Sequence, residues 1–565
     1  MAFPLSPAVQ ITEQNLSQFV VTTSNTTVAI VGYATNGPLN TPTLINSKAA
    51  FQNTFGNPTT LAPWGAMAAL RSLNQTSSLL YYRVANITQG DSTAQAQYAE
   101  RVSMSVGHSD SAAGYRGGAD SNKIQIIAKN PGSGYNTSYV TLTQRTNPVT
   151  GDSMWDWRFF YNGVLQETYN GITWRVGDSH YFATIINATP QNGGSNWIVV
   201  NTRAYGKYPS YIRLAPLGIS GTVSQLNLGA SNGAGDTRYR VYSRGDSYGA
   251  KPGTLGYYTF AYGRDGVLGG TTGYTGDTLF TNALATTGAL ANQELWNYHI
   301  IMAPDNGDNA VANALVSLVE NRTDALAIID PPQAVSVASV VAWHNGLGNG
   351  RTSALNSSYS ATWWPWLMDY NSIAGQYVWV PPSVFMGEKL CYVDNNFGPW
   401  YAPAGDIRGL LAAYNYEQSP SASDRDNLYG GLNAVNPIVN FASRGLEIYG
   451  QKTLSRTTSA INRINVRRMI IYIKKLIKNA VDQLVFEPNN ADSWARCRTI
   501  INAILEPVRQ ANGLADYKVI IDSTTTTPSL IQQSIMAGTI QIVPVGTIEI
   551  ISLTLQINPT GSNIV

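Results

Sequence analysis

Apolar positions follow two different rhythms in the first hundred residues. The apolar run VAIVGYA at 28–34 predicts a buried strand, which a Gly-Pro turn follows. The segment SKAAFQNTFG then has helical spacing, with Ser47 placed to cap its start and Gly56 its end. A second helical segment and a second apolar strand follow, APWGAMAALRSLN at 62–74 and SLLYYRVA at 78–85. This succession of strand, helix, helix and strand predicts an α/β core with mixed sheets and helices.

Between residues 116 and 274 the pattern changes to short segments that Gly, Asn and Pro separate. Alternation of apolar and polar residues in such segments predicts strands with one buried face. The segments are IQIIAKN (124–130), SYVTLTQR (138–145), WDWRFFYN (155–162), HYFATIIN (180–187), NWIVVN (196–201) and RYRVYSR (238–244). The sequence therefore predicts an all-β domain inserted into the α/β core.

Helical spacing returns after the strand-rich segment. Residues 309–322, NAVANALVSLVENR, have it, and Asp308 stands where a carboxylate caps the start of a helix. The stretch DALAIIDPP at 324–332 predicts a further buried strand, so the α/β core resumes. Beyond residue 375 we expect a loop-rich stretch, then a basic helical segment and a further helix at 492–513.

The last part of the sequence predicts three strands, YKVIID (517–522), GTIQIVPV (538–545) and IEIISLTLQI (548–557). In the third of these, apolar residues alternate with Ser, Thr and Gln, which is typical of a strand with one buried face. The apolar positions are Ile551, Leu553, Leu555 and Ile557. A strand near the end of a chain can pair with a sheet of a neighbouring molecule as readily as with its own. These four residues are therefore candidates for an inter-subunit strand.

The composition is that of a folded protein with an unusually uncharged surface. Hydrophobic residues make up 44% of the 565 and aromatic residues 10%, which excludes a disordered chain. Charged residues are only 12%, and the formal net charge is +2. Such a surface repels its own copies weakly, which favours a protein that packs against itself. The small net charge argues against attraction of the whole protein to nucleic acid or to an anionic membrane.

The cysteine content fits a chain that folds in a reducing cytoplasm. The two cysteines, Cys391 and Cys497, can form at most one bridge, so a disulfide framework is excluded. The segment MAFPLSPAVQITEQ has neither the basic nor the apolar region of a secretory signal. No window approaches 18 consecutive apolar residues, so we expect no membrane insertion.

The sequence contains few residue patterns that are typical of enzymes, and we expect no catalytic, cofactor or metal site. The four histidines are far apart and lack metal-ligand spacing. The segment GASNG at 229–233 matches G-x-S-x-G around Ser231, but the strand and helix that this motif needs do not flank it. A tryptophan cluster, Trp363, Trp364 and Trp366, can stack on sugars, although core or interface packing is the commoner role.

One segment concentrates positive charge. The stretch RINVRRMIIYIKKLIKNAVDQ at 463–483 contains a single acid, Asp482, and six basic residues: Arg463, Arg467, Arg468, Lys474, Lys475 and Lys478. Its apolar residues have helical spacing and form one face. A solvated helix face and a protein-binding face both remain open. A membrane-surface helix is disfavoured because folded segments follow, and nucleic-acid binding because neither further basic clusters nor interleaved aromatic residues accompany it.

An ordered series of motifs resembles the contractile tail sheath proteins of phages and their relatives in contractile bacteriocins. The series is TTVAIVGYATNGPLNTPTLINSKAAFQNTFG, SLLYYRV, IIAKNPGSGYNTSYVTL, AIIDPP, WWPWL, VWVPPSVFMG, PWYAPAGDIRG, NLYGGLNAVNPIV, RGLEIYGQKTL, INVRRMIIYIKKLIKNAVDQLVFEPNNADSW and GLADYKVIID. The resemblance covers nearly the whole chain and is strongest over residues 375–557. No single motif decides it, but so many in one order are hard to obtain by chance.

The resemblance implies structural work rather than catalysis. Sheath subunits stack as hexameric rings in a helical sleeve around a tail tube, and the sleeve contracts to drive the tube through the host envelope. The implied partners are further copies of this chain, the tail tube protein, and baseplate and tail terminator proteins. The implied location is the virion tail, assembled in the host bacterial cytoplasm. The resemblance also implies terminal arms that add strands to a neighbouring subunit.

For the basic segment, the resemblance favours a surface that faces the tube. Long-range attraction to acidic groups suits a contact that must be released. The tube-facing candidates are Arg463, Arg467, Lys474, Lys475 and Lys478. Arg467 and Arg468 match an Arg-Arg pair of the family and can instead pair within the chain, for instance with Glu487.

Pattern and resemblance together predict five parts. These are an N-terminal linking arm (1–22), an α/β sheath core (23–115 and 275–374), an inserted β-rich outer domain (116–274), a C-terminal inner α/β domain (375–538) and a C-terminal linking arm with its strand (539–565). Two alternatives stay open from the residues alone. One is a non-sheath virion component such as a β-rich tail fibre or adhesin, and the other is a secreted hydrolase.

Overall fold

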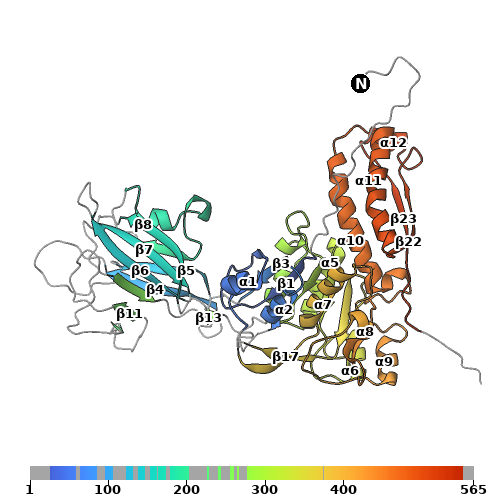
Figure 1. The fold of residues 1–565 in the computed structure, drawn as a ribbon, viewed down its shortest axis with the longest axis horizontal. Helices are drawn as coiled ribbons and strands as arrows, with labels where there is room; N and C mark the ends of the chain where they lie inside the picture. The colour runs from blue at the N-terminus through green and yellow to red at the C-terminus, as the bar shows by residue number, and fades with distance from the viewer. Residues whose placement is uncertain are drawn as a thin grey trace, which may run out of the picture.

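A computed structural model of the chain (Figure 1) gives the arrangement of most of these segments. It describes residues 26–58, 64–85, 96–105, 123–131, 138–146, 153–161, 163–173, 178–202, 226–227, 240–243, 255–259, 264–265, 276–372 and 374–550. The predicted N-terminal arm, residues 1–22, lies outside the described residues. So do Ile551, Leu553, Leu555 and Ile557 of the predicted inter-subunit strand.

An eight-stranded sheet forms the centre of the molecule. Its strands in spatial order are β2 (Pro42–Ile45), β3 (Leu79–Arg83), β1 (Val28–Gly32), β14 (Ile300–Met302), β15 (Leu326–Ile329), β16 (Ser360–Trp364), β20 (Val435–Phe441) and β21 (Gly445–Ile448). The six strands from β3 to β20 run parallel, and only the two edge strands are antiparallel. Because β20 and β21 belong to this sheet, the boundary expected at residue 375 runs through the core rather than between two domains.

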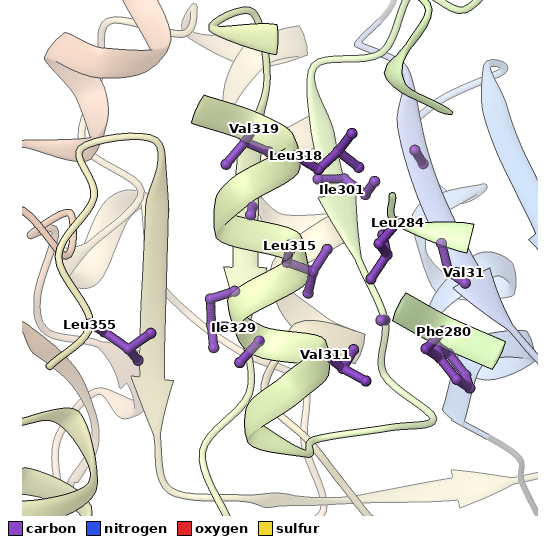
Figure 2. Close-up of a cluster of buried hydrophobic side chains, with 14 of the residues drawn as sticks. Val31, Phe280, Leu284, Ile301, Val311, Leu315, Leu318, Val319, Ile329 and Leu355 are labelled. Carbon is purple, nitrogen blue, oxygen red and sulfur yellow. The ribbon is translucent and has the colours of Figure 1, made fainter. Parts of the chain in front are cut away.

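Helices cover both faces of the central sheet, as buried parallel strands require. One face packs against α4 (Gly276–Ala283), α5 (Asn309–Arg322), α6 (Val337–His344) and α9 (Ala422–Tyr429), and the other against α1 (Lys48–Phe55), α2 (Trp64–Ser72) and α7 (Ser383–Asn396). Figure 2 shows the first face, where Val311, Leu315 and Leu318 of α5 point toward the strands. Each fully buried aliphatic side chain of this kind stabilises the fold by about 1.5–3 kcal/mol.

Several local predictions are confirmed in this core. Ser47 caps α1 by accepting a hydrogen bond from the Ala50 amide, and Gly56 ends the helix with a φ of 82°. Asp308 caps α5 by accepting from the Ala310 amide. The tryptophans of the WWPW cluster are buried, so their role here is packing.

The prediction of a loop-rich stretch after residue 375 is wrong at α7. This 14-residue helix has no side-chain cap of its own, and its start follows two prolines. The cap comes from β15, where Asp330 accepts hydrogen bonds from the Ser383 amide (2.9 Å) and the Ser383 hydroxyl (2.6 Å). A helix that is buried along much of its length and capped from a distant strand lacks the amphipathic pattern that marks a helix in sequence.

Between β3 and α4 the chain forms two further antiparallel sheets. One contains β10 (Leu226–Asn227), β11 (Arg240–Ser243), β12 (Leu255–Thr259), β6 (Tyr139–Thr146), β7 (Ser153–Tyr161) and β8 (Val164–Ile172), and the other contains β13 (Arg264–Asp265), β4 (Ala96–Ser105), β5 (Lys123–Pro131) and β9 (Ile198–Thr202). One predicted strand is instead a helix, α3 (Phe182–Ile186). Its buried residues, Phe182 and Ile186, are four apart and therefore share one helical face.

A smaller sheet and a C-terminal unit complete the described part of the chain. The sheet contains β18 (Gln376–Val380), β17 (Leu367–Asn371) and β19 (Asn415–Tyr416), and the short helix α8 (Gly405–Arg408) lies near it in sequence. The C-terminal unit contains α10 (Ile464–Val481), α11 (Ala491–Gln510), β22 (Leu514–Ile520), α12 (Pro528–Gln532) and β23 (Thr539–Pro544). Figure 1 shows this unit standing to one side of the central sheet, with the strand-rich segment on the other side.

The helix α10 joins the C-terminal unit to the core. Ile464 and Ile471 pack into the apolar cluster beneath the central sheet. Val466, Met469 and Ile473 pack into a separate cluster with α11 and β22. The basic segment is therefore a helix, as predicted, but it has apolar contacts on two sides rather than one.

Candidate assembly surfaces

The basic residues of α10 fall into two groups, buried and exposed. Arg468 is 5% exposed and forms an ion pair with Asp394 of α7. The Thr26 hydroxyl donates a second hydrogen bond, 2.5 Å long, to the same carboxylate. Burial raises the pKa of Asp394, and the Arg468 guanidinium opposes that rise. This pair fastens α10 to the core.

Arg467 and Lys475 are also buried, at 5% and 9% exposure. The Arg467 guanidinium lies 4.1 Å from the centre of the Tyr359 ring and donates to the Ser358 hydroxyl at 2.5 Å. Lys475 donates to the Asn297 side chain at 2.6 Å and lies 3.4 Å from the Asp324 carboxylate. Burial lowers the pKa of Lys475 to about 8, even though Asp324 acts in the opposite direction.

These contacts correct part of the predicted tube-facing set. Arg467 and Lys475 are buried within the single chain, at a place where a tube-facing residue was expected to be exposed. The expectation that Arg467 and Arg468 pair within the chain agrees with the structure. The suggested partner Glu487 is wrong, because Asp394 pairs with Arg468, and Ser358 and Tyr359 contact Arg467.

Lys474 and Lys478 are the exposed pair on α10. Lys474 donates to the Thr323 carbonyl (2.9 Å) and the Thr323 hydroxyl (3.0 Å), at the C-terminal end of α5. A cation there also interacts favourably with the negative end of the helix dipole. Of the predicted residues on the helix itself, these two are placed to meet a partner. A contact with a tube stays a prediction.

Arg463, the remaining candidate, precedes the first turn of α10 and is half-buried. Its guanidinium forms an ion pair with Glu549, with Nε 2.7 Å from Oε1 and Nη2 2.9 Å from Oε2. The sequence patterns did not single out Glu549, because its partner lies 86 residues away along the chain. The same holds for Asp394, which is 74 residues from Arg468.

The hairpin of β22 and β23 is a second candidate surface. The strands pair antiparallel, and α11 packs beside β22. Within the described part of the chain this sheet has two strands, so each strand has one edge without a neighbour. Apolar side chains are exposed on it, with Ile540 at 38% and Val543 at 53%. Unpaired edges with exposed apolar residues can receive a strand from another chain.

Other kinds of site find no support in the residues that the structure describes. Among them, no group of three or more His, Cys, Asp or Glu side chains is arranged to hold a metal ion. Across the same ranges, no helix combines the length and the hydropathy needed to cross a bilayer. Cys391 and Cys497 are both buried and unbridged.

Comparison with known proteins identifies the C-terminal unit. Residues 456–558 match the family model of the phage tail sheath C-terminal domain, and this range contains α10, α11 and the hairpin. A tail sheath protein of Vibrio phage KVP40 is 28% identical over 265 residues, which is 44% of this chain and 39% of the relative. Over these residues the chain is similar to phage tail sheath proteins. The resemblance seen in the sequence motifs is thereby confirmed.

Two further comparisons bear on the extent of the relationship. The tail sheath protein of Enterobacteria phage T4 is 28% identical over 266 residues, 45% of this chain and 40% of the relative. The matches thus span about two fifths of the length of these curated relatives. A crystallised sheath tail protein from Listeria innocua has the same fold over 93% of this chain and 96% of its own, with a TM-score of 0.53 and 12% identity.

Proposed function

We propose that the protein is the structural subunit of a contractile tail sheath. In this proposal it polymerises as stacked hexameric rings around the tail tube and contracts to drive the tube through the host envelope. The observation that carries the proposal is the match of residues 456–558 to the tail sheath C-terminal domain. The likeness to a sheath tail protein along nearly the whole chain supports it. A tail fibre or an adhesin would not account for either.

We propose an architecture that fits this function. The strand-rich segment between β3 and α4 would be the inserted, outward-facing domain. The central sheet would form the sheath core and would extend through β21, since that strand lies in the same sheet. The C-terminal unit would face the tube. Residues 1–22 and the part of the predicted arm 539–565 that follows β23 would supply the linking arms.

The proposed contacts between subunits use the open edges of the hairpin. An arm strand such as ISLTLQI, residues 551–557, has the alternation that such an edge accepts. Main-chain hydrogen bonds formed in this way would keep subunits connected while the rigid parts move. The low content of charged residues, 12%, fits a surface that meets many copies of itself.

The proposed contact with the tube uses Lys474 and Lys478. Both are exposed on one helix, and attraction between exposed charges weakens with salt, which suits a reversible contact. The other proposed partners are baseplate and tail terminator proteins, and the proposed place is the virion tail, assembled in the host bacterial cytoplasm. The function requires no enzymatic step, because energy is stored in the assembled polymer.

Electron microscopy of the purified protein tests this proposal. We expect hollow, striated tubes of constant width at increasing protein concentration, alone or with the tube protein of the same phage. Small monodisperse particles under both conditions would contradict a sheath function. Discrete trimers with affinity for glycans would instead favour a tail fibre or adhesin.

A further inference from the structure

The segment that follows the hairpin is held against the core by a small set of polar contacts. After β23, the Val545 amide donates to the Gly513 carbonyl at 3.2 Å. The chain then passes residues of the core, where Gln451 donates through Nε2 to the Thr547 hydroxyl at 2.6 Å. Glu549 receives hydrogen bonds to Oε1 from Gln451 (3.2 Å) and from the Tyr429 hydroxyl (3.3 Å). Arg463 completes the set with its bidentate ion pair.

The residues that hold Glu549 are themselves fixed by contacts with one another and with their neighbours in sequence. The Ile464 amide donates to the Gln451 carbonyl at 2.8 Å, which sets Arg463 beside Gln451. The Gln451 amide donates to the Tyr429 hydroxyl at 3.2 Å. The Lys452 ammonium lies 4.4 Å from the centre of the Tyr429 ring and donates to the Tyr429 carbonyl. The three donors to the carboxylate are thus arranged by the fold and not by the segment that they bind.

Side chains alternate along the held segment. Thr547 and Glu549 make the contacts with the core. Ile548 and Ile550 are exposed, at 81% and 87%. This alternation is typical of an extended segment. It leaves one apolar face exposed directly before the sequence ISLTLQI.

We propose that Arg463, Gln451 and Tyr429 form a carboxylate-binding site whose ligand is Glu549, and that this site anchors the C-terminal tail to the core. The anchor fixes the point from which residues after 550 leave the subunit. A force applied to the tail is then transmitted through Glu549 to the core near the start of α10, and it does not separate β23 from β22. The role in assembly rests on the proposed sheath function, whereas the anchoring itself does not.

The chemistry of the site favours a carboxylate on an extended segment. A guanidinium facing both carboxylate oxygens supplies two parallel charge-assisted hydrogen bonds, which fix orientation as well as position. Gln451 bonds two residues of the segment, Thr547 and Glu549, and so recognises side chains two positions apart. That spacing selects a strand, because only there do residues i and i+2 share a face.

Spin labels measure the anchoring in the unassembled chain. Labels attached at Ile550→Cys and Leu347→Cys use exposed positions, with 87% and 80% exposure, and both native cysteines are buried. We expect one narrow distance in the otherwise unchanged chain and loss of that distance in E549Q, because a neutral amide cannot replace the bidentate ion pair. The charge exchange R463E with E549R should restore it. The variant E506Q, which removes the exposed Glu506–Arg509 pair, should change nothing and serves as the matched control.

A narrow distance that persists in E549Q, or a charge exchange that fails to restore it, would overturn the anchor. Tube formation tests its use in assembly, and E549Q should form fewer and shorter tubes than the unchanged protein. Tubes that form equally well from E549Q would overturn this use, while leaving the sheath function intact. If the unchanged protein forms no tubes, the sheath function fails, and the distances alone decide whether the tail is anchored.

Discussion

The central sheet and the C-terminal hairpin are both made of apolar, β-favouring residues, yet their surroundings are opposite. Every residue of β1, VAIVG, is buried, and the same is true of β3 and β16. In β23, TIQIVP, four of the six residues are exposed and none is fully buried. The sheet has helices on both faces, whereas the hairpin is packed beside α11 and, within the described ranges, has no further strand at its edges.

Among the residues that the structure describes, the chain covers the strands of the core on both faces but leaves the hairpin partly uncovered. Apolar residues in a strand stabilise the fold when other side chains shield them from water. In the core, helices of the same chain shield them. The hairpin keeps Ile540, Val543 and Val545 partly exposed, which is costly in water unless another surface meets them. The helix α10 links the two regions through its buried pair with Asp394.

The largest effect on stability should follow from breaking that link. In Asp394→Ala the Arg468 guanidinium stays buried without its partner, and loss of one partner of a buried pair costs about 3–5 kcal/mol. Chemical denaturation should show this loss in the free energy of unfolding. Glu506→Gln, which breaks a partly exposed pair on α11, should cost less than about 1 kcal/mol. Equal curves for the two variants would contradict the buried link.

A matched pair of truncations compares the two regions directly. Leu318→Ala removes a fully buried side chain from the cluster of Figure 2, and the resulting cavity should lower the free energy of unfolding by about 2–5 kcal/mol. Ile540→Ala on the hairpin should cost less than about 1 kcal/mol, because the side chain is already 38% exposed. Similar losses in both variants would show that the hairpin is packed within the single chain.

The sequence predicted the local features of the core and of α10 well. Caps at Ser47 and Asp308, the apolar strands and the helical spacing of the basic segment all depend on residues close in sequence. The sequence did not predict features that depend on a residue far away along the chain. The helix α7 takes its cap from Asp330, which is 53 residues away.

The same limit applies to the candidate surface. Periodicity identified the apolar face of α10 but did not separate Lys475, which is buried, from Lys474, which is exposed. Acidic side chains from other elements help to determine which lysine is buried. The Asp324 carboxylate, for example, lies 3.4 Å from the Lys475 ammonium. Sequence spacing contains no information on such partners, so the direction in which each basic residue points could not be predicted.

The pH dependence of stability should arise in part from two buried carboxyl groups of the core. Burial raises the pKa of Asp330 to about 7, while in the unfolded chain the carboxyl has its ordinary pKa of 3.8. The folded chain then binds the proton more tightly, so this group's contribution is present at low pH and is lost as the pH rises toward 7. Asp305, also raised to about 7, acts in the same direction. Asp330→Asn should flatten the dependence between pH 4 and 7, as thermal unfolding in a pH series would show.

Asp330→Asn retains an oxygen for the Ser383 amide and an N–H for the Ser383 hydroxyl, so α7 keeps its cap. A pH profile identical to that of the unchanged protein would mean that Asp330 is ionised throughout.

The smallest effect on stability is expected at the exposed end of α10. Lys478→Glu should change the free energy of unfolding by less than about 0.5 kcal/mol, because the side chain is exposed. It should nevertheless weaken assembly around the tube, most clearly at low salt, where exposed charges interact over longer distances. Lys48→Glu, at an exposed lysine of the core, is the matched control. Tube-templated assembly as efficient as in that control would remove Lys478 from the proposed contact.

The most direct test of the comparison is hydrogen exchange on the unassembled chain and on the assembled tubes. We expect β22 and β23 to gain protection on assembly, because their open edges receive strands from other copies. We expect β1, β14 and β15 to keep the protection they already have in the single chain. Unchanged exchange in the hairpin, with new protection in the central sheet, would contradict the claim that the chain covers the strands of the core but leaves the hairpin partly uncovered.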